Sequence, residues 1–220
     1  MRTVGLVSWE SGTGQNTVAV NLAIGLIRRG KRVILVNLSH NMKIYNWLGT
    51  SEEELSFGHI YSSNNRVDFI YPAASDRGPL LDKLSYDYAI LNIGGDEAVY
   101  CEQGIRCSDL IIACTRLKNP DECGQLLNLQ SKIKNYRKDN QGFDLLLPMQ
   151  IHSGEWKTNS QRLFELAEAF GEELIADFLP HCERIHDLSL QKWSVWDLPQ
   201  PAIINAFDRM LERVEEMTGI

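Results

Sequence analysis

The sequence lacks the features that mark several classes of protein. None of its apolar runs approaches the length of a membrane span, and no charged-then-apolar signal segment opens the chain, so we expect neither a membrane anchor nor a signal peptide. The five cysteines are odd in number and form no Cys-x-x-Cys pair, which favours reduced thiols in a cytoplasmic setting. Internal repeats and low-complexity linkers are absent as well.

Basic side chains are in the minority. The 220 residues carry 22 Lys and Arg against 29 Asp and Glu, for a net charge of −7, and this acidic balance argues against DNA as a partner of the whole surface. Hydrophobic residues make up 44% of the chain. That content at this length allows a sizeable core, so we expect one soluble α/β domain over residues 1–220.

Apolar runs that alternate with helical stretches predict a doubly wound, mostly parallel sheet. Several runs are unbroken, as is typical of parallel strands buried on both faces. The polar segment 51–65 contains three consecutive glutamates, and we expect it to be a mobile loop. The expected strands are 2–8, 32–38, 67–72, 88–93, 109–114, 143–148 and 174–179, and the expected helices are 15–29, 97–106, 121–138, 158–170 and 201–218.

A glycine-rich loop joins the first expected strand to the first expected helix. Residues 8–17 read Ser-Trp-Glu-Ser-Gly-Thr-Gly-Gln-Asn-Thr. In this strand–loop–helix context, backbone amides at the helix N-terminus hold phosphate. A Gly-x-Gly-Lys-Ser/Thr run occurs nowhere in the chain, so we expect no conventional phosphate loop elsewhere.

This loop resembles the deviant Walker A loop of the ParA/MinD family of P-loop ATPases, whose pattern is Ser-Gly-Lys-Gly-Gly-x-Gly-Lys-Thr-Thr. By that resemblance, Glu10 stands where the signature lysine reaches across a dimer to the partner's ATP. Gln15 replaces the P-loop lysine, and Asn16 replaces the magnesium-binding hydroxyl. The residues that match the pattern are Ser8, Gly12, Gly14 and Thr17.

The resemblance continues along nearly the whole chain, but the later motifs have lost their carboxylates. The family's Asp-x-Asp-Pro-Gln segment is here Asn-Leu-Ser-His-Asn at 37–41, so that Asn37 and Ser39 replace both aspartates. The Walker B region reads Tyr-Asp-Tyr-Ala-Ile-Leu-Asn from residue 86, with Asn92 where the metal-organising aspartate belongs. The resemblance implies a ParA/MinD-type P-loop NTPase fold with degenerate nucleotide-binding motifs.

These substitutions remove the charges that bind Mg-ATP. A cation–phosphate contact near 4 Å is worth about 4 kcal/mol at an effective dielectric constant near 20, whereas micromolar affinity amounts to only about 8 kcal/mol. We therefore expect no meaningful ATPase activity, no catalytic residue, no bound metal and no cofactor, with ATP or ADP binding weak at most. The vestigial phosphate loop comprises Glu10, Ser11, Gly12, Thr13, Gly14, Gln15, Asn16 and Thr17, and the vestigial metal and water positions are Asn37, Ser39 and Asn92.

Three other features have an ordinary structural interpretation beside a functional one. His181, Cys182 and His186 suggest a metal site, but surface residues without a fourth ligand explain them better. The basic end of the helix at 121–138 resembles a DNA-binding patch, but it also suits the helix dipole. The final helix, 201–218, is acidic where membrane-binding relatives are basic, so we expect it to pack on the sheet instead of binding a membrane directly.

Five tryptophans suggest a protein partner, because exposed tryptophans often anchor interfaces. We expect most of them to be packed, with Trp9 filling space that a nucleotide leaves. Three functions remain open: a non-catalytic scaffold or positioning factor, which resembles the TadZ/CpaE branch that localises pilus or secretion machinery; an atypical ATP- or ADP-binding protein; and an ATPase that takes lysines from a partner subunit. The partner is a second copy of the chain, a related ParA-like subunit or another protein.

Overall fold

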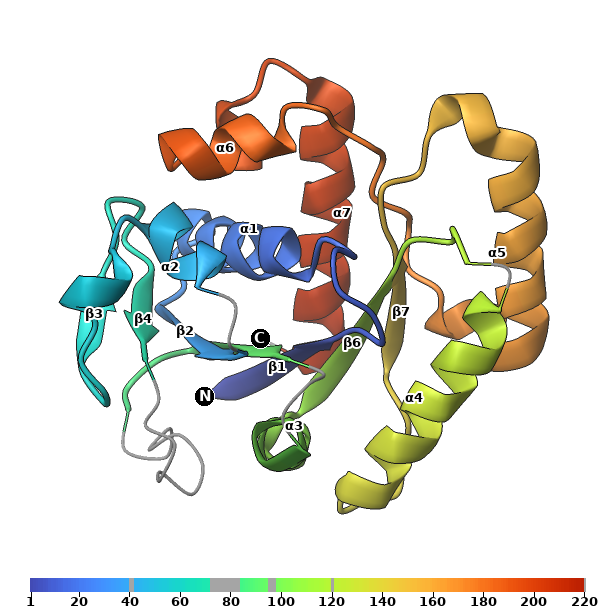
Figure 1. Cartoon of the computed structure of the whole chain (residues 1–220), viewed down its shortest axis with the longest axis horizontal. Helices are drawn as coiled ribbons and strands as arrows, with labels where there is room; N and C mark the ends of the chain where they lie inside the picture. The colour runs from blue at the N-terminus through green and yellow to red at the C-terminus, as the bar shows by residue number, and fades with distance from the viewer. Residues whose placement is uncertain (40–41, 72–83, 95–97, 120, 220) are drawn as a thin grey trace.

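The computed structural model describes residues 1–39, 42–71, 84–94, 98–119 and 121–219 (Figure 1). Within that part of the chain, seven strands form one sheet in the order β3-β4-β2-β5-β1-β6-β7. All neighbouring strands are parallel except β3 and β4, which are antiparallel. The strands are β1 Arg2–Val7, β2 Val33–Leu38, β3 Ile60–Ser62, β4 Asp68–Ile70, β5 Tyr88–Ile93, β6 Leu110–Thr115 and β7 Leu145–Pro148.

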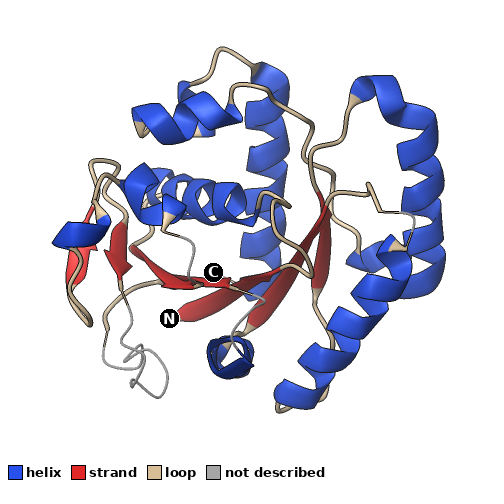
Figure 2. Cartoon of the chain, in the orientation of Figure 1, coloured by secondary structure: helices blue, strands red, loops and turns tan. Residues whose placement is uncertain are grey.

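Helices cover both faces of this sheet, as Figure 2 shows. One face carries α1, α2, α6 and α7, and the other carries α3, with α4 and α5 beside β6 and β7 (Figure 1). The predicted doubly wound, mostly parallel α/β architecture is therefore confirmed. The α-helices are α1 Gln15–Arg28, α2 Lys43–Leu48, α3 Ala98–Cys107, α4 Glu122–Tyr136, α5 Trp156–Phe170, α6 Ile185–Gln191 and α7 Pro201–Thr218.

The strands divide the core into two layers because successive side chains point to opposite faces. In β5, Tyr88 and Ile90 join the cluster under α1 and α7, whereas Ala89, Leu91 and Ile93 join the cluster under α3 and α4. Full burial of one Leu or Ile side chain stabilises the fold by about 1.5–3 kcal/mol. All six residues of β5 are buried, which explains why Asn92 is the one strongly polar residue in this strand.

The sheet order places the glycine-rich loop at the point where the chain reverses direction across the sheet. β1 lies between β5 and β6, and the strands that follow it in sequence lie on both sides. Register pairs Leu6 with Asn92 across β1 and β5, and Asn37 with Asn92 across β5 and β2. The carboxyl ends of these three strands therefore form one edge, which is where doubly wound folds bind ligands.

Two expectations about the elements were wrong. The stretch 174–179 forms no strand: it begins with the end of a short 3-10 helix, Glu172–Leu174, and contacts β7 through an isolated bridge from Ile175 to Leu146 and through backbone hydrogen bonds from Ala176 to Leu146 and from Leu179 to Pro148. The segment 51–65 is an organised one, because it contains a 3-10 turn at Glu52–Glu54 and the edge strand β3. Among the described residues, no helix is both long and apolar enough to span a bilayer.

Candidate functional site

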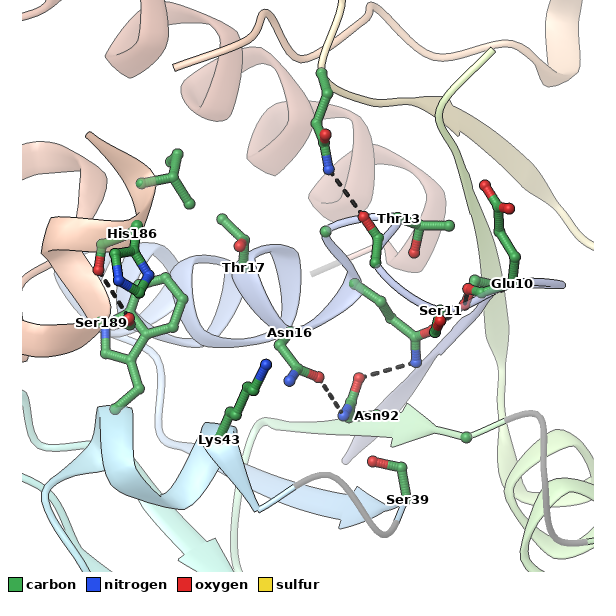
Figure 3. A pocket seen from close by; sticks show the side chains of 18 of the residues that line it. Glu10, Ser11, Thr13, Asn16, Thr17, Ser39, Lys43, Asn92, His186 and Ser189 are labelled. Carbon is green, nitrogen blue, oxygen red and sulfur yellow. Dashed lines mark hydrogen bonds between the residues drawn. The ribbon is translucent and has the colours of Figure 1, made fainter. Parts of the chain in front are cut away.

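A cleft of about 680 Å³ opens at the carboxyl edge of the sheet, above the glycine-rich loop (Figure 3). It brings together all eight predicted phosphate-loop residues with Ser39 and Asn92, and Asn37 lies beneath it against Asn92. The adjoining His40 and Asn41 lie outside the described residues. The lining residues are Ser8, Trp9, Glu10, Ser11, Gly12, Thr13, Gly14, Gln15, Asn16, Thr17, Ser39, Lys43, Trp47, Asn92, Gly94, Gln150, Ile185, His186 and Ser189.

The loop keeps the backbone conformation of a phosphate cradle. Gly12 and Gly14 have φ angles of 77° and 98°, a left-handed region that glycine reaches without steric cost. A Cβ on Gly14 would meet Met149 Cε at 2.8 Å, so a side chain there would require the Met149 side chain to move. The Gln150 Nε2 group donates to the Gly12 carbonyl at 3.0 Å, which ties the loop to the same segment.

Gln15, at the first position of α1, directs its side chain back to the strand ends. Its Nε2 group donates to Leu6 O at 2.9 Å, Asn92 Oδ1 at 2.8 Å and Ile93 O at 3.0 Å. Its Oε1 atom accepts a hydrogen bond from Ser8 Oγ at 2.7 Å. The side chain at the P-loop lysine position is therefore neutral and already engaged on both its nitrogen and its oxygen.

An uncharged amide network replaces the expected carboxylates at the ends of β2 and β5. The Asn92 Nδ2 group donates to Asn16 Oδ1 at 2.9 Å and to Asn37 Oδ1 at 2.7 Å. Ser39 Oγ donates to the same Asn37 oxygen at 2.9 Å. Asn37 and Asn92 are 2% and 1% exposed, so a charge at either place would be buried. Neutral partners therefore satisfy the hydrogen-bonding groups of these side chains, as a buried site without a cation requires.

Glu10, at the signature-lysine position, forms an ion pair with Arg116. Arg116 follows β6, and its Nη2 and Nε atoms lie 2.9 Å and 3.2 Å from Glu10 Oε1. Sequence analysis did not identify Arg116, because 106 residues separate it from Glu10 and only the pairing of β1 with β6 brings them together.

The Trp9 side chain lines the cleft and contacts the start of α4, and its filling of nucleotide space stays a prediction. Its indole Nε1–H donates to Glu122 Oε1 at 2.9 Å, and Thr115 Oγ1 donates to the same oxygen. The ring packs on the hydrophobic cluster under α3 and α4. Glu122 is 4% exposed, and its Oε2 atom has no hydrogen-bond partner among the described residues. Burial raises the pKa of Glu122, the Trp9 hydrogen bond opposes that rise, and the charge of Glu10 adds to it.

Helices α2 and α6 add side chains to the cleft; sequence analysis missed Lys43 and Ser189 and interpreted His186 as a surface residue. Figure 3 shows Lys43 of α2 directed toward Asn16, on the opposite side of the cleft from Glu10. His186 and Ser189 line the wall formed by α6. Glu10 is the one carboxylate and Lys43 the one lysine among the described lining residues, and Arg116 adds a positive charge beside Glu10.

The comparisons find proteins with the same fold and little sequence identity. A Cyanothece McdA variant in complex with ATP has a TM-score of 0.80 at 17% identity, covering 100% of this chain and 97% of that one. The MinC:MinD complex of Aquifex aeolicus has a TM-score of 0.80 at 13% identity, covering 98% of this chain and 96% of that one. A putative plasmid partition protein from Borrelia burgdorferi bound to AMPPNP has a TM-score of 0.76 at 18% identity, covering 98% of each chain. The chain has the ParA/MinD-type P-loop fold. No protein-family model and no curated protein sequence matches it.

Outside the cleft, the structure shows the contacts of the three other features that sequence analysis named. The part of the chain that the structure describes holds no cluster of three or more metal-ligating side chains, and His181 stacks on His152 with ring centroids 3.8 Å apart. Arg137, in the basic end after α4, pairs with Asp139 and Asp144. Helix α7 packs its apolar face into the core as expected, through Ile203, Phe207, Met210, Leu211 and Val214.

Proposed function

We propose that this chain is a non-catalytic protein of the ParA/MinD-type fold that acts as a scaffold or positioning factor for a protein partner. The observation that carries the proposal is the hydrogen-bonded amide network of Gln15, Asn16, Asn37 and Asn92. It occupies the places where the resemblance puts the lysine, the magnesium-binding hydroxyl and the metal-site carboxylates.

Phosphoryl transfer depends on positioning and on electrostatic stabilisation of charge on the transferred group. Metal ions supply much of that charge, and Mg²⁺ prefers oxygen ligands such as carboxylates. The described lining of the cleft offers a single carboxylate, Glu10, and Arg116 already holds it. Lys43 is the one lysine among the lining residues, and it reaches the cleft from α2 instead of from the loop. The proposal therefore assigns the cleft no ATPase chemistry.

Internal contacts hold the loop in shape without a nucleotide. Trp9 and Glu10 are each bound to the segment after β6, through Glu122 and Arg116. Gln15 is bound to the strand ends on the other side. A loop held in this way keeps the surface around the cleft constant, which is what a docking surface requires, since pre-ordered groups lose less entropy on binding.

Exposed aromatic side chains support a protein partner. Trp156 and Trp193 are 52% and 41% exposed, and large exposed aromatic residues are frequent anchors of interfaces. Among proteins of the same fold, MinD occurs in a complex with MinC. We propose a protein partner for this chain as well: a second copy, a related ParA-like subunit or, if the chain is TadZ/CpaE-like, a component of pilus or secretion machinery.

The second candidate is an atypical ATP- or ADP-binding protein with weak or partner-assisted ATPase activity. The size of the cleft, about 680 Å³, supports this function, because small-molecule sites measure about 300–1,000 Å³. Lys43 adds a positive charge facing the cleft.

Calorimetric titration with ATP, with and without Mg²⁺, separates the two candidates. The scaffold proposal predicts no saturable magnesium-dependent binding at micromolar ATP and phosphate release no faster than in protein-free buffer. Saturable magnesium-dependent binding without turnover supports the second candidate, and turnover contradicts the non-catalytic assignment.

A further inference from the structure

The ion pair between Glu10 and Arg116 lies at the edge of the cleft. Two nitrogens of the guanidinium, Nη2 at 2.9 Å and Nε at 3.2 Å, share one carboxylate oxygen, Glu10 Oε1. The Arg116 side chain is 26% exposed and the Glu10 side chain 23% exposed. They are therefore held in place by their surroundings and still open to exchange with solvent ions.

Arg116 also lies against the glycine-rich loop itself. A Cβ on Gly12 would stand 3.5 Å from Arg116 Nη1 and 3.9 Å from its Cζ. The guanidinium therefore lies close to the backbone that borders the cleft. Gly12 and Glu10 both line the cleft, so the positive charge of Arg116 stands beside it and the negative charge of Glu10 stands within its wall.

A guanidinium binds a carboxylate and a phosphate with the same planar set of N–H donors. The donors that Glu10 occupies are therefore not available to an entering phosphate group. Beside them, the first three residues of α1 line the cleft, and the free amides of a helix N-terminus favour anions. Resting on the proposed function above, we propose that Arg116 is an anion-binding residue for a phosphate-bearing small molecule. Glu10 inhibits this binding because its carboxylate occupies the Arg116 donors.

Two effects of Glu10 must be separated. Its carboxylate repels an anion directly, and it also withholds Arg116 from that anion. Replacement of Glu10 by glutamine abolishes both effects, because an amide carries no charge and pairs only weakly with a guanidinium. Replacement of both residues by glutamine abolishes the repulsion but supplies no cation. The difference between the two variants therefore measures what Arg116 contributes.

The test is calorimetric titration with inorganic pyrophosphate in metal-free buffer at low ionic strength. We expect Glu10→Gln to bind pyrophosphate at least about tenfold more tightly than the unchanged protein, and Glu10→Gln with Arg116→Gln to return to within about threefold of it. The matched control is Glu102→Gln, which removes the same charge from an ion pair with Arg106 on α3 and should leave the affinity unchanged. Glu10→Ala provides a second variant, and circular dichroism establishes that each variant is folded.

The proposal is overturned if Glu10→Gln and Glu10→Ala both bind pyrophosphate no more tightly than Glu102→Gln, or if the double variant retains the full gain. Neither result contradicts the proposed function, which is tested separately by magnesium-dependent ATP binding and turnover of the unchanged protein. Conversely, ATP turnover by the unchanged protein contradicts the non-catalytic assignment, whatever the Glu10 variants do.

Discussion

The amide network predicts that a carboxylate returned to the Walker B position destabilises this chain. In Asn92→Asp, an oxygen replaces the Nδ2 group that donates to Asn16 Oδ1 and Asn37 Oδ1. The hydrogen bond accepted from Gln15 survives, but the amide oxygens of half-buried Asn16 and buried Asn37 then face a third oxygen. This change creates the metal-site residue of an active relative, so it asks whether the present site still fits that chemistry.

The structure sets the magnitude. Asn16 is half-buried, so its amide can rotate and present its nitrogen to the new carboxylate. Asn37 is 2% exposed, and rotation of its amide would break its bonds with Ser39. One lost hydrogen bond costs about 1 kcal/mol and one unsatisfied buried group about 1–3 kcal/mol. We therefore expect Asn92→Asp to lower the free energy of unfolding by about 2–4 kcal/mol at neutral pH.

This loss should depend on pH. Burial raises the pKa of the introduced carboxyl above its unfolded value of about 3.9. The folded state then binds more protons than the unfolded state between these two pKa values, so the loss grows as pH rises through that window. Urea unfolding at several pH values from 4.5 to 8, with and without Mg²⁺, measures it.

The matched control is Asn128→Asp, the same chemical change at an exposed position of α4. Substitutions of this kind on the surface usually change the free energy of unfolding by no more than about 0.5 kcal/mol. If Asn92→Asp costs no more than this control, or if Mg²⁺ restores its stability, the account of a neutral site that has lost its metal is wrong.

Three further predictions concern the loop and its supports. Gln15→Lys should release no phosphate from ATP above background in a coupled assay, because Asn16, Asn37 and Asn92 still provide no metal site; hydrolysis by this single variant argues against the account. Glu122→Gln should become more stable relative to the unchanged protein as pH rises from about 4, because burial raises the pKa of Glu122 and ionisation of the buried carboxyl then costs stability. Urea unfolding measures this, and a difference in free energy of unfolding between the two proteins that is the same at pH 4.5 and 7.5 contradicts it. Gly25→Ala should lose about 1–3 kcal/mol by overpacking, since its Cβ would meet Leu211 Cδ1 at 2.5 Å and Trp196 Cη2 at 2.6 Å; an unchanged melting temperature would exclude that contact.

The fold and most of the candidate site follow from local sequence patterns. Unbroken apolar strands alternating with helices predict a parallel sheet, and the carboxyl ends of neighbouring parallel strands lie at one edge. The resemblance to the ParA/MinD family predicted that the loop, Asn37 and Asn92 belong to one site, and the register of β2 with β5 places the two asparagines side by side.

The parts that sequence analysis missed depend on contacts between distant segments. Arg116 and Glu122 lie 106 and 113 residues from their loop partners, so no periodicity connects them. The edge strand β3 has only three residues in a polar segment, which is too short for an alternation signal. Conversely, the mostly apolar run at 174–179 looks like a strand, but it joins β7 through one isolated bridge and two backbone hydrogen bonds and forms no continuous ladder.

The central claim is that the cleft holds no metal-bound triphosphate, and a crystal structure with AMPPNP and Mn²⁺ tests it most directly. The anomalous signal of Mn²⁺ locates the metal independently of the protein map. The account predicts no manganese peak between Asn16 and Asn92 and no triphosphate in the loop. A manganese peak at that position, with the triphosphate bound above Gly12 and Gly14, would contradict it.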